Sequence, residues 1–523
     1  MKSAGTVGIA VMVSRVLGLV RDQVFTACFG VGLLTDAFYM AFRIPNLLRD
    51  LFAEGALSTA FVTVFARKRA QEGDEAAWRL SRLTMTLQCL LLGALVLLGV
   101  WFAPAIVGWM AHGYTQPGKM ELTVVLTRIL FPFILFVGMA ALSMGVLNSY
   151  GHFGLPASAS SFFNLGSIVV GVGLALILDP SFGETAIVCM AIGSLCGGIL
   201  QWLVQVPALW KLGYRYRPAW NLSDPGLRDI GRLMGPALIG ASAVQINVVI
   251  NSVFASKFDG AVTMLAVAFR LVQLPIGLFG VAISTASLPG MAVAATLDNK
   301  ESLRQRIEHA LRLNAALCIP AACGLAILGV PLIGVLFQRG KFDSDSTLAT
   351  ARILIAFSIG LIAYASSKIL VSAFYAMNRT AIPMCVSLGS IIVTFTLNWL
   401  LVKYTTFGAA GLALTTSTVS IFSSGILLAN LACLVGAPSP GTWKAIGKIV
   451  VASAIMSGLV FLSLWIHTEL GVGFLFWGNL SRVVVGVGLG ALSYAGMTRW
   501  LKLEEVAELE RALLRKLKPA ARS

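Results

Sequence analysis

The sequence predicts an all-α protein that crosses a membrane many times, and its composition and the length of its apolar runs lead to this prediction. Of the 523 residues, 57% are hydrophobic and only 12% are charged, which is far from the balance of a chain that folds in water. The apolar runs have the length of about 20 residues that a membrane-spanning helix needs. These observations exclude a soluble enzyme, a disordered chain and a disulfide scaffold. They also exclude an outer-membrane barrel, whose strands alternate over about ten residues.

Fourteen apolar runs have this length, and we expect one transmembrane helix in each of them. An even number of spans places the two ends of the chain on the same side of the membrane. The expected spans are 7–27, 33–64, 84–111, 121–149, 157–178, 185–209, 229–255, 262–292, 309–337, 347–376, 381–402, 408–434, 445–468 and 474–500.

The placement of the basic residues gives the orientation. The chain has 39 Lys and Arg, and most of those outside the spans lie in or beside connections on the N-terminal side. Because basic residues gather on the cytoplasmic side of membrane proteins, both termini are expected there. The net charge of +16 is expected to face anionic membrane lipids rather than nucleic acid. The connections expected outside hold only Lys119, Lys257, Arg339, Lys341 and Lys403.

The eight cysteines lie within or at the edge of the apolar runs. We therefore expect them to be small packing residues rather than disulfides or metal ligands. The four histidines are scattered along the chain, and no metal-binding spacing is present.

The chain contains an internal duplication. Ala41-Phe42-Arg43 recurs as Ala268-Phe269-Arg270, and Arg128-Ile129-Leu130 recurs as Arg352-Ile353-Leu354 at nearly the same spacing. A third match, between Ser58-Thr59-Ala60 and Ser284-Thr285-Ala286, keeps this spacing. Six helices per copy is an even number, so the two copies have the same orientation, and a substrate site is expected between them.

The duplication predicts the organisation of the chain. We expect two pseudo-symmetric six-helix lobes, 1–209 and 229–434, joined by an amphipathic interfacial linker at 210–228. Residues 445–500 form helices 13 and 14 outside the repeat. Residues 501–523 have apolar residues at helical spacing, which predicts an amphipathic helix on the cytoplasmic surface whose deletion is tolerated.

Charged residues inside the first span are the first anomaly. Helical spacing places Arg15 and Asp22 on one face, where they could partly neutralise each other, whereas Arg21 points about 120° away from Arg15.

The second span carries a polar stripe formed by Arg43, Asp50 and Glu54, with Asn46 and Arg49 beside it. An Arg at the centre of a bilayer costs about 2.5 to 3.5 kcal/mol, and the nearby acids cannot pair with every Arg. A water-filled cavity is therefore expected. Guanidinium groups stay charged and present planar forks of donors that suit phosphate oxygens, so the expected guest is anionic, with a diphosphate as the best match.

Other basic residues within the spans have different expectations. Arg128 and Arg352 lie near helix ends, where a structural position at the lipid surface is favoured. The roles of Lys368 and Arg482 stay open.

The polar motifs resemble the bacterial lipid II flippase family MurJ (MviN), which belongs to the MOP exporter superfamily. The resemblance extends from residue 1 to the end of the last expected span. It rests on the runs Ser14-Arg15-Val16-Leu17-Gly18, Arg21-Asp22, Thr35-Asp36-Ala37-Phe38, Pro45-Asn46-Leu47-Leu48-Arg49, Phe52-Ala53-Glu54-Gly55-Ala56, Pro275-Ile276-Gly277-Leu278-Phe279-Gly280-Val281-Ala282 and Leu336-Phe337-Gln338-Arg339-Gly340 with Phe342.

This resemblance implies a transporter in the bacterial inner membrane that is not an enzyme. It implies that a monomer moves lipid II, the undecaprenyl-diphosphate-linked peptidoglycan precursor, from the cytoplasmic to the periplasmic leaflet by alternating access. Residues 445–500 are then expected to form a groove for the lipid tail. Phe269 departs from some relatives, which have an acid beside the arginine that corresponds to Arg270.

The resemblance also implies roles for particular side chains. The substrate-binding residues are expected to be Arg15, Arg21, Asn46, Arg49 and Arg270. The gating or cavity residues are expected to be Asp22, Asp36, Arg43 and Glu54.

The energy source is expected to be the membrane potential or a cation gradient, because the chain has no phosphate-binding loop of the GxxxxGK[ST] kind. The resemblance suggests a sodium ion in the C-terminal lobe. The polar candidates are Asn247, Asn251, Thr394 and Asn398, although buried amides also hold helices together.

Two other functions were weighed. A superfamily exporter of another polyprenyl-linked oligosaccharide or of drugs is the nearer alternative, but a drug exporter should have more acids than bases in its cavity. A membrane glycosyltransferase could use Asp343-Ser344-Asp345 as a metal-binding motif. A helix cap at the same residues is the simpler interpretation.

Overall fold

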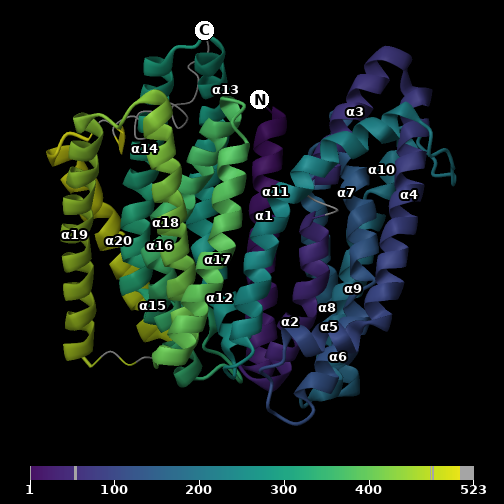
Figure 1. The fold of residues 1–523 in the computed structure, drawn as a ribbon. Coiled ribbons are helices and arrows are strands. Elements are labelled where there is room, and N and C mark those ends of the chain that lie inside the picture. The colour runs from purple at the N-terminus through teal and green to yellow at the C-terminus, as the bar shows by residue number, and fades with distance from the viewer. Residues whose placement is uncertain (1, 52–55, 472, 474–475, 504, 507–523) are drawn as a thin grey trace, which may run out of the picture. The chain divides into compact units, whose positions relative to one another are not determined.

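The computed structural model describes residues 2–51, 56–471, 473, 476–503 and 505–506, and these contain long helices and no strand (Figure 1). The chain divides into two compact units. The first comprises Met1–Thr263 and Arg339–Phe342, and the second comprises Met264–Gln338 and Asp343–Ser523.

The helices of the first unit precede the break at Thr263, although α12 begins just before it. They are α1 (Lys2–Phe29), α2 (Leu33–Arg49), α3 (Ala56–Glu72), α4 (Asp74–Trp101), α5 (Ala103–Met110), α6 (Lys119–Leu130), α7 (Phe133–Ser149), α8 (Gly154–Leu178), α9 (Glu184–Leu203), α10 (Val206–Lys211) and α11 (Pro225–Ala255).

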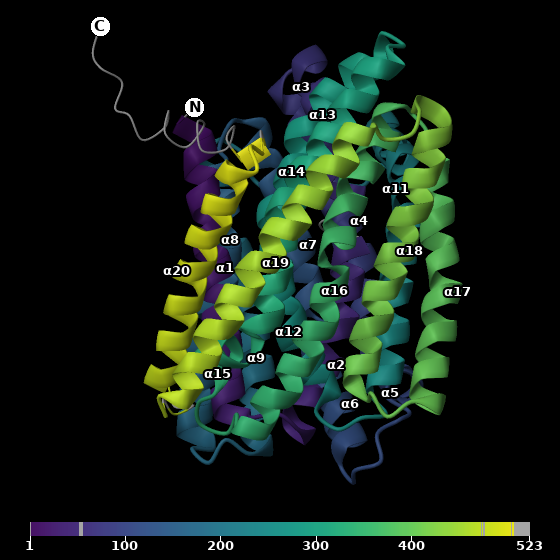
Figure 2. The same cartoon turned by 90° about the vertical axis from the view of Figure 1, so that its left-hand side faces the viewer.

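The second unit contains most of α12 and the helices after it. Figure 2 shows α17 beside α18 and α19 beside α20. The elements are α12 (Ala261–Pro275), the π-helical segment η2 (Ile276–Val281), α13 (Ala282–Thr296), α14 (Lys300–Ile327), α15 (Gly329–Phe337), α16 (Ser344–Ala376), α17 (Ala381–Tyr404), α18 (Ala409–Val435), α19 (Pro440–Glu469) and α20 (Phe476–Trp500).

The predicted class, an all-α polytopic membrane protein, is confirmed. Within the described residues, eleven helical stretches are long and apolar enough to cross a membrane. Large apolar side chains also face outward, such as Leu97 and Trp101, which are 74% and 80% exposed, as lipid-facing residues must be. The count of fourteen stays a prediction, because the expected spans 7–27, 33–64 and 229–255 are not among these eleven.

Several expected spans are broken within their length. Span 121–149 consists of α6 and α7 with Pro132 between them, and span 262–292 consists of α12, η2 and α13. Proline lacks a backbone donor and interrupts a helix. π-Helical turns follow both copies of the repeated Ala-Phe-Arg motif, at residues 50–51 and at Ile276–Val281.

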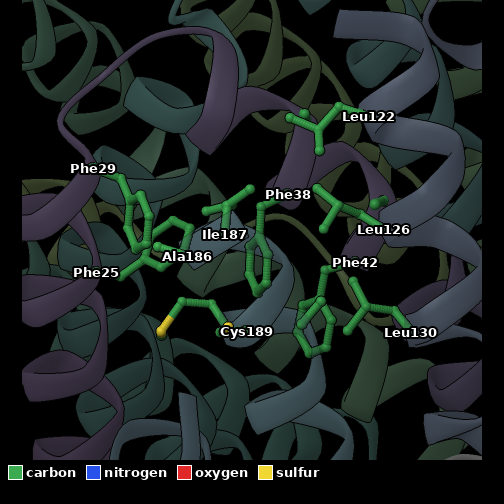
Figure 3. Close-up of a cluster of buried hydrophobic side chains, with 14 of the residues drawn as sticks. Phe25, Phe29, Phe38, Phe42, Leu122, Leu126, Leu130, Ala186, Ile187 and Cys189 are labelled. Atoms are coloured by element: carbon green, nitrogen blue, oxygen red, sulfur yellow. The ribbon is translucent and has the colours of Figure 1, made fainter. Parts of the chain in front are cut away.

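The core of the first unit gathers around aromatic side chains of α1 and α2. Phe25 packs on Phe38 at a centroid distance of 4.7 Å, and Phe42 packs on Phe133 at 5.3 Å. Figure 3 shows the rings of Phe25, Phe38 and Phe42 in one cluster with Leu126 of α6 and Ile187 of α9. The cluster fixes α2, which carries Asp36, Arg43, Asn46 and Arg49 of the predicted site, within the first unit.

Small residues bring the helices close together. A Cβ atom on Gly193 of α9 would lie 2.4 Å from the backbone nitrogen of Gly171 in α8, so only glycine fits there. This packing is typical of membrane bundles, where close van der Waals contact replaces the hydrophobic effect.

Side chains cap the starts of α11, α14 and α16. Asp224 accepts a hydrogen bond from the Gly226 amide at 2.8 Å, and Asn299 accepts one from Ser302 at 2.9 Å. Asp343 accepts one from Ser346 at 2.8 Å, which confirms the cap expected at Asp343-Ser344-Asp345.

The lobe and linker boundaries stay predictions, but the structure adds detail to them. The first compact unit extends to Thr263, so it includes α11, which packs mainly with α3. Within 210–228, α10 ends at Lys211 and α11 begins at Pro225, with no helix at 212–224. Trp210 and Trp220 are exposed, whereas Tyr214 is buried.

The cysteine expectation holds only in part. All eight cysteines are free, and Cys189 and Cys318 are buried, but Cys385 and Cys433 are exposed rather than packed in a core.

The structure describes only the first residues of the tail, and the amphipathic surface helix expected at 501–523 stays a prediction. Leu503 is buried, and the carboxylate of Glu505 lies 2.7 Å from Nε of Arg312 on α14. This short charged contact ties Glu505 to α14. Residues 507–523 lie outside the described residues, and their tolerance to deletion stays a prediction.

We expect Glu505→Gln to lower the free energy of unfolding by about 1 to 3 kcal/mol, because it removes a charged partner from a largely buried pair. Thermal unfolding in detergent measures this. Glu469→Gln, at an exposed position at the end of α19, is the control and should leave the midpoint unchanged. An unchanged midpoint in both variants would show that the tail contact contributes nothing.

Candidate functional site

Helix α1 presents two of the predicted arginines. Arg21 donates from Nε and Nη2 to the same oxygen of Asp22, at 3.2 and 2.9 Å, and its guanidinium lies 5.3 Å from the ring centre of Phe163. Arg15 is exposed. Helical spacing placed Asp22 with Arg15, but the carboxylate turns to its sequence neighbour, a contact that face-by-face reasoning does not consider.

Helix α2 presents the next pair at its C-terminal end. Arg49 donates from Nε and Nη2 to Oδ1 of Asp50, at 3.1 and 2.8 Å, and Gln245 of α11 donates to Oδ2 of Asp50 at 3.4 Å. The stripe expected from Arg43 to Glu54 cannot be completed, because Glu54 lies outside the described residues. Arg43 itself is half-buried.

Asn46 stands one turn before Asp50 on α2. Its Oδ1 atom is buried and has no hydrogen-bond partner among the described residues. A buried polar atom without a partner is costly, so this position suits a residue that gains a partner when a ligand binds.

The two Arg–Asp pairs share a geometry in which a substrate can replace the carboxylate as the partner of the guanidinium. The side chains of Arg21 and Arg49 are 15% and 26% exposed, and those of Asp22 and Asp50 are 5% and 39% exposed. Both guanidinium groups keep part of their surface accessible, and the Arg49–Asp50 pair, which is exposed on both sides, contributes little stability. Each pair also uses a single carboxylate oxygen. A diphosphate offers more oxygens and more charge to the same planar forks.

Asp36 of α2 is placed very differently, because it has no exposed surface at all. Its Oδ1 accepts hydrogen bonds from the amide and the hydroxyl of Thr263, at 3.0 and 2.8 Å. Its Oδ2 accepts one from the Gly260 amide at 2.8 Å. Since α12 begins at Ala261, Asp36 acts as the N-cap of a helix that is distant in the sequence.

Lys119 is the counterion of this carboxylate. Its ammonium lies 3.1 Å from Asp36 and 3.3 Å from Asp259, and 4.3 Å from the ring centre of Tyr114. Lys119 is fully buried, whereas the Asp259 side chain is 65% exposed. The charge of Asp36 is therefore held by one buried ammonium and three donors from the α11–α12 turn and the start of α12.

Sequence reasoning identified Asp36 but missed Lys119, Gly260 and Thr263. It counted Lys119 only as one of the basic residues outside the spans, because a single Lys before an apolar helix carries no periodic signal. Only the packing of α6 against α2 reveals this partner.

Arg270 belongs to α12 in the second unit and is half-buried. Its neighbour Phe269 packs on Phe357 and Tyr364, at centroid distances of 5.2 and 6.2 Å. The position where some relatives have an acid is therefore occupied here by an aromatic packing residue. A small cavity of about 10 Å³ borders Phe269 and has only apolar and hydroxyl side chains in its lining. Such a lining does not suit a diphosphate.

The four cation candidates fall into two pairs in different units. Asn247 and Asn251 lie one turn apart on α11, and Thr394 and Asn398 lie one turn apart and buried on α17. A sodium site at these residues stays a prediction.

The remaining basic residues within the spans also have defined places. Arg128 and Arg352 are exposed. Lys368 is also exposed, and its ammonium lies 5.5 Å from the ring centre of Tyr364. Arg482 is only 2% exposed and donates to the Gly473 carbonyl at 3.2 Å. Arg482 thus braces the start of α20.

Comparison with known proteins places these motifs in one family. A family model described as "Lipid II flippase MurJ" matches residues 25–481. The protein "Lipid II flippase MurJ" of Burkholderia cenocepacia is 35% identical over 456 residues, which cover 86% of this chain and 87% of that protein.

Solved structures give the same result. "Lipid II flippase MurJ, inward closed conformation" matches with a TM-score of 0.77 at 28% identity, covering 95% of this chain and 99% of that one. An inward-facing multidrug resistance MATE family transporter of the MOP superfamily matches with a TM-score of 0.67 at 16% identity, covering 83% and 95%. The second likeness concerns the fold alone.

We expect Lys119→Met to lower the free energy of unfolding by about 3 to 5 kcal/mol, because it leaves the buried Asp36 carboxylate without its counterion. Asp259→Asn, at the exposed end of the same cluster, should cost less than about 1 kcal/mol. Thermal unfolding of the purified protein compares the two. Equal losses would show that the buried pair is not the centre of the cluster.

Proposed function

Because the chain belongs to the lipid II flippase MurJ family, whose members are transporters, we propose that its arginines bind the diphosphate of lipid II during transport. Lipid II is the substrate that this family implies. The binding residues are Arg15, Arg21, Arg49 and Arg270, assisted by Asn46. The observation that carries the proposal is that Arg21 and Arg49 each donate to a single oxygen of the carboxylate of the next residue. A diphosphate can take the place of that oxygen.

The chemistry of the exchange follows from these pairs. Asp22 and Asp50 keep the guanidinium groups oriented while no substrate is bound. A diphosphate then replaces the carboxylates at the forks, and the released acids are repelled by the added negative charge. Arg43 and Glu54 complete the polar lining of the cavity.

Asp36 acts in gating. Its carboxylate joins α2, which carries Arg49, to the start of α12, which carries Arg270 further along. Breaking these hydrogen bonds frees the N-terminus of α12, while Lys119 of α6 stays beside Asp36. The two arrangements provide the two-state element that alternating access needs.

The direction and setting of transport complete the proposal. The protein lies in the bacterial inner membrane with both termini in the cytoplasm, and a monomer moves lipid II from the cytoplasmic to the periplasmic leaflet. Residues 445–500 hold the lipid tail. Energy comes from the membrane potential or from a sodium gradient.

We expect Arg49→Ala and Arg270→Ala each to lower lipid II transfer by at least about tenfold, since each removes a charged hydrogen-bonding partner worth more than about 1.4 kcal/mol. The measurement reconstitutes the protein in liposomes with labelled lipid II and scores headgroups exposed in the far leaflet, with and without an imposed potential. Arg49→Lys keeps the charge but loses the fork, and should transfer at an intermediate rate.

Arg128→Ala and Arg352→Ala are the matched controls, because these arginines are exposed on α6 and α16, and both should transfer like the unaltered protein. Insertion and folding are checked by thermal unfolding in each case. Normal transfer by Arg49→Ala and Arg270→Ala would overturn the site assignment.

A further inference from the structure

Four residues between α15 and α16 leave the second unit and pack in the first. Arg339–Phe342 belongs to the first compact unit, although Gln338 and Asp343 on either side belong to the second. We call these four residues the strap. They overlap the Leu336–Gly340 and Phe342 motif, to which the transport proposal gives no role.

The strap contacts the end of α1 through its backbone. The Lys341 amide donates to the Ala27 carbonyl at 2.9 Å. A Cβ atom on Gly30 would lie 2.6 Å from the Lys341 carbonyl oxygen. The two backbones therefore approach as closely as their atoms allow.

Gly340 makes this approach possible. Its φ is +56°, and a Cβ atom there would lie 2.2 Å from the Ala27 carbonyl oxygen. A side chain at this position would meet both backbone strain and a clash with backbone, which cannot move aside as a flexible side chain can.

The Lys341 side chain anchors the strap to a second segment. Its ammonium donates to the carbonyls of Ser181 and Phe182, at 2.9 and 3.0 Å. Asp179 braces this α8–α9 turn by accepting from the amides of Gly183 and Ala186, at 2.9 and 3.2 Å. The ring of Phe182 also packs edge-on against Phe29, at a centroid distance of 5.6 Å.

These contacts are specific but individually weak. The Lys341 side chain reaches water, and a hydrogen bond open to water contributes only about 0.5 to 1.5 kcal/mol. The docked strap is thus well defined in geometry yet can be released at low cost, which is the property of a contact that opens and closes during a cycle.

We infer that the strap positions α1, the helix that carries Arg15 and Arg21, by tying its end to α15 and α16. Movement of α15 and α16 relative to α1 must either break the strap contacts or carry α1 along. The inference rests on the proposed alternating access. In the proposed topology the strap acts on the outer side of the membrane, where it holds α1 while the headgroup is loaded from the inner leaflet.

The first test is backbone hydrogen exchange of the full chain in detergent. Gly340→Ala should accelerate exchange in the peptide covering residues 339–342 by about tenfold or more, because the Lys341 amide loses its acceptor. The matched control is Gly408→Ala, since Gly408 has the same φ of +56° but nothing within 4 Å of its Cβ position. Gly408→Ala should leave that peptide unchanged.

The second test is lipid II transfer in liposomes. Gly340→Ala should lower transfer by about tenfold, whereas Gly408→Ala should not. Lys341→Met should lower transfer, and Lys341→Arg, which keeps a cationic donor, should restore it. If Gly340→Ala does not fold, the Lys341 pair decides the question, because that side chain is exposed.

The outcomes separate this inference from the function it rests on. Unchanged exchange in Gly340→Ala would overturn the docking, and fast exchange with normal transfer would overturn the link to transport. Absence of lipid II transfer by the unaltered protein would instead contradict the proposed function. Exchange would still report whether the strap docks.

Discussion

A charge inside an apolar bundle must have a partner, and this constraint is strongest at Asp36. Its carboxylate is fully buried, so both oxygens take hydrogen bonds from the surroundings. These come from the Lys119 ammonium and from the residues at the start of α12. Because α2, α6 and the α11–α12 turn all contribute to one buried charge, none of them can move alone without exposing an unpaired group.

The arginines of α1 and α2 meet the same constraint in another way. Arg21 and Arg49 each pair with the next residue in the chain and keep part of their surface exposed. The Arg49–Asp50 pair is exposed on both sides and contributes little to stability, whereas the Asp22 side chain is only 5% exposed. The first unit therefore combines a fully buried charge cluster at Asp36 with two Arg–Asp pairs between neighbours in the chain, whose guanidinium groups keep accessible surface for a substrate.

Close backbone contact is the second theme of the structure. Lipid provides no hydrophobic driving force between helices, so small residues that allow close approach take its place. Gly193 serves this purpose between α8 and α9, and Gly340 serves it between the strap and α1. At Gly340 the close contact is between the end of α1 and the short strap rather than between two helices, so this contact is easier to release.

The sequence by itself determined the all-α membrane class, because apolar runs of spanning length have no other stable form in lipid. It also determined the cap at Asp343 and singled out α1 and α2 as the polar helices, since these features are local in the chain. The motifs predicted the family, which the comparisons confirmed.

Tertiary structure alone decided which groups meet. It brought Lys119 to Asp36, made Asp36 the cap of α12, and paired Glu505 with Arg312. Helical periodicity reports the face on which a residue lies but not the side chain on another element that reaches it. A buried charge finds its partner through three-dimensional packing, so residues far apart in the chain complete the candidate site.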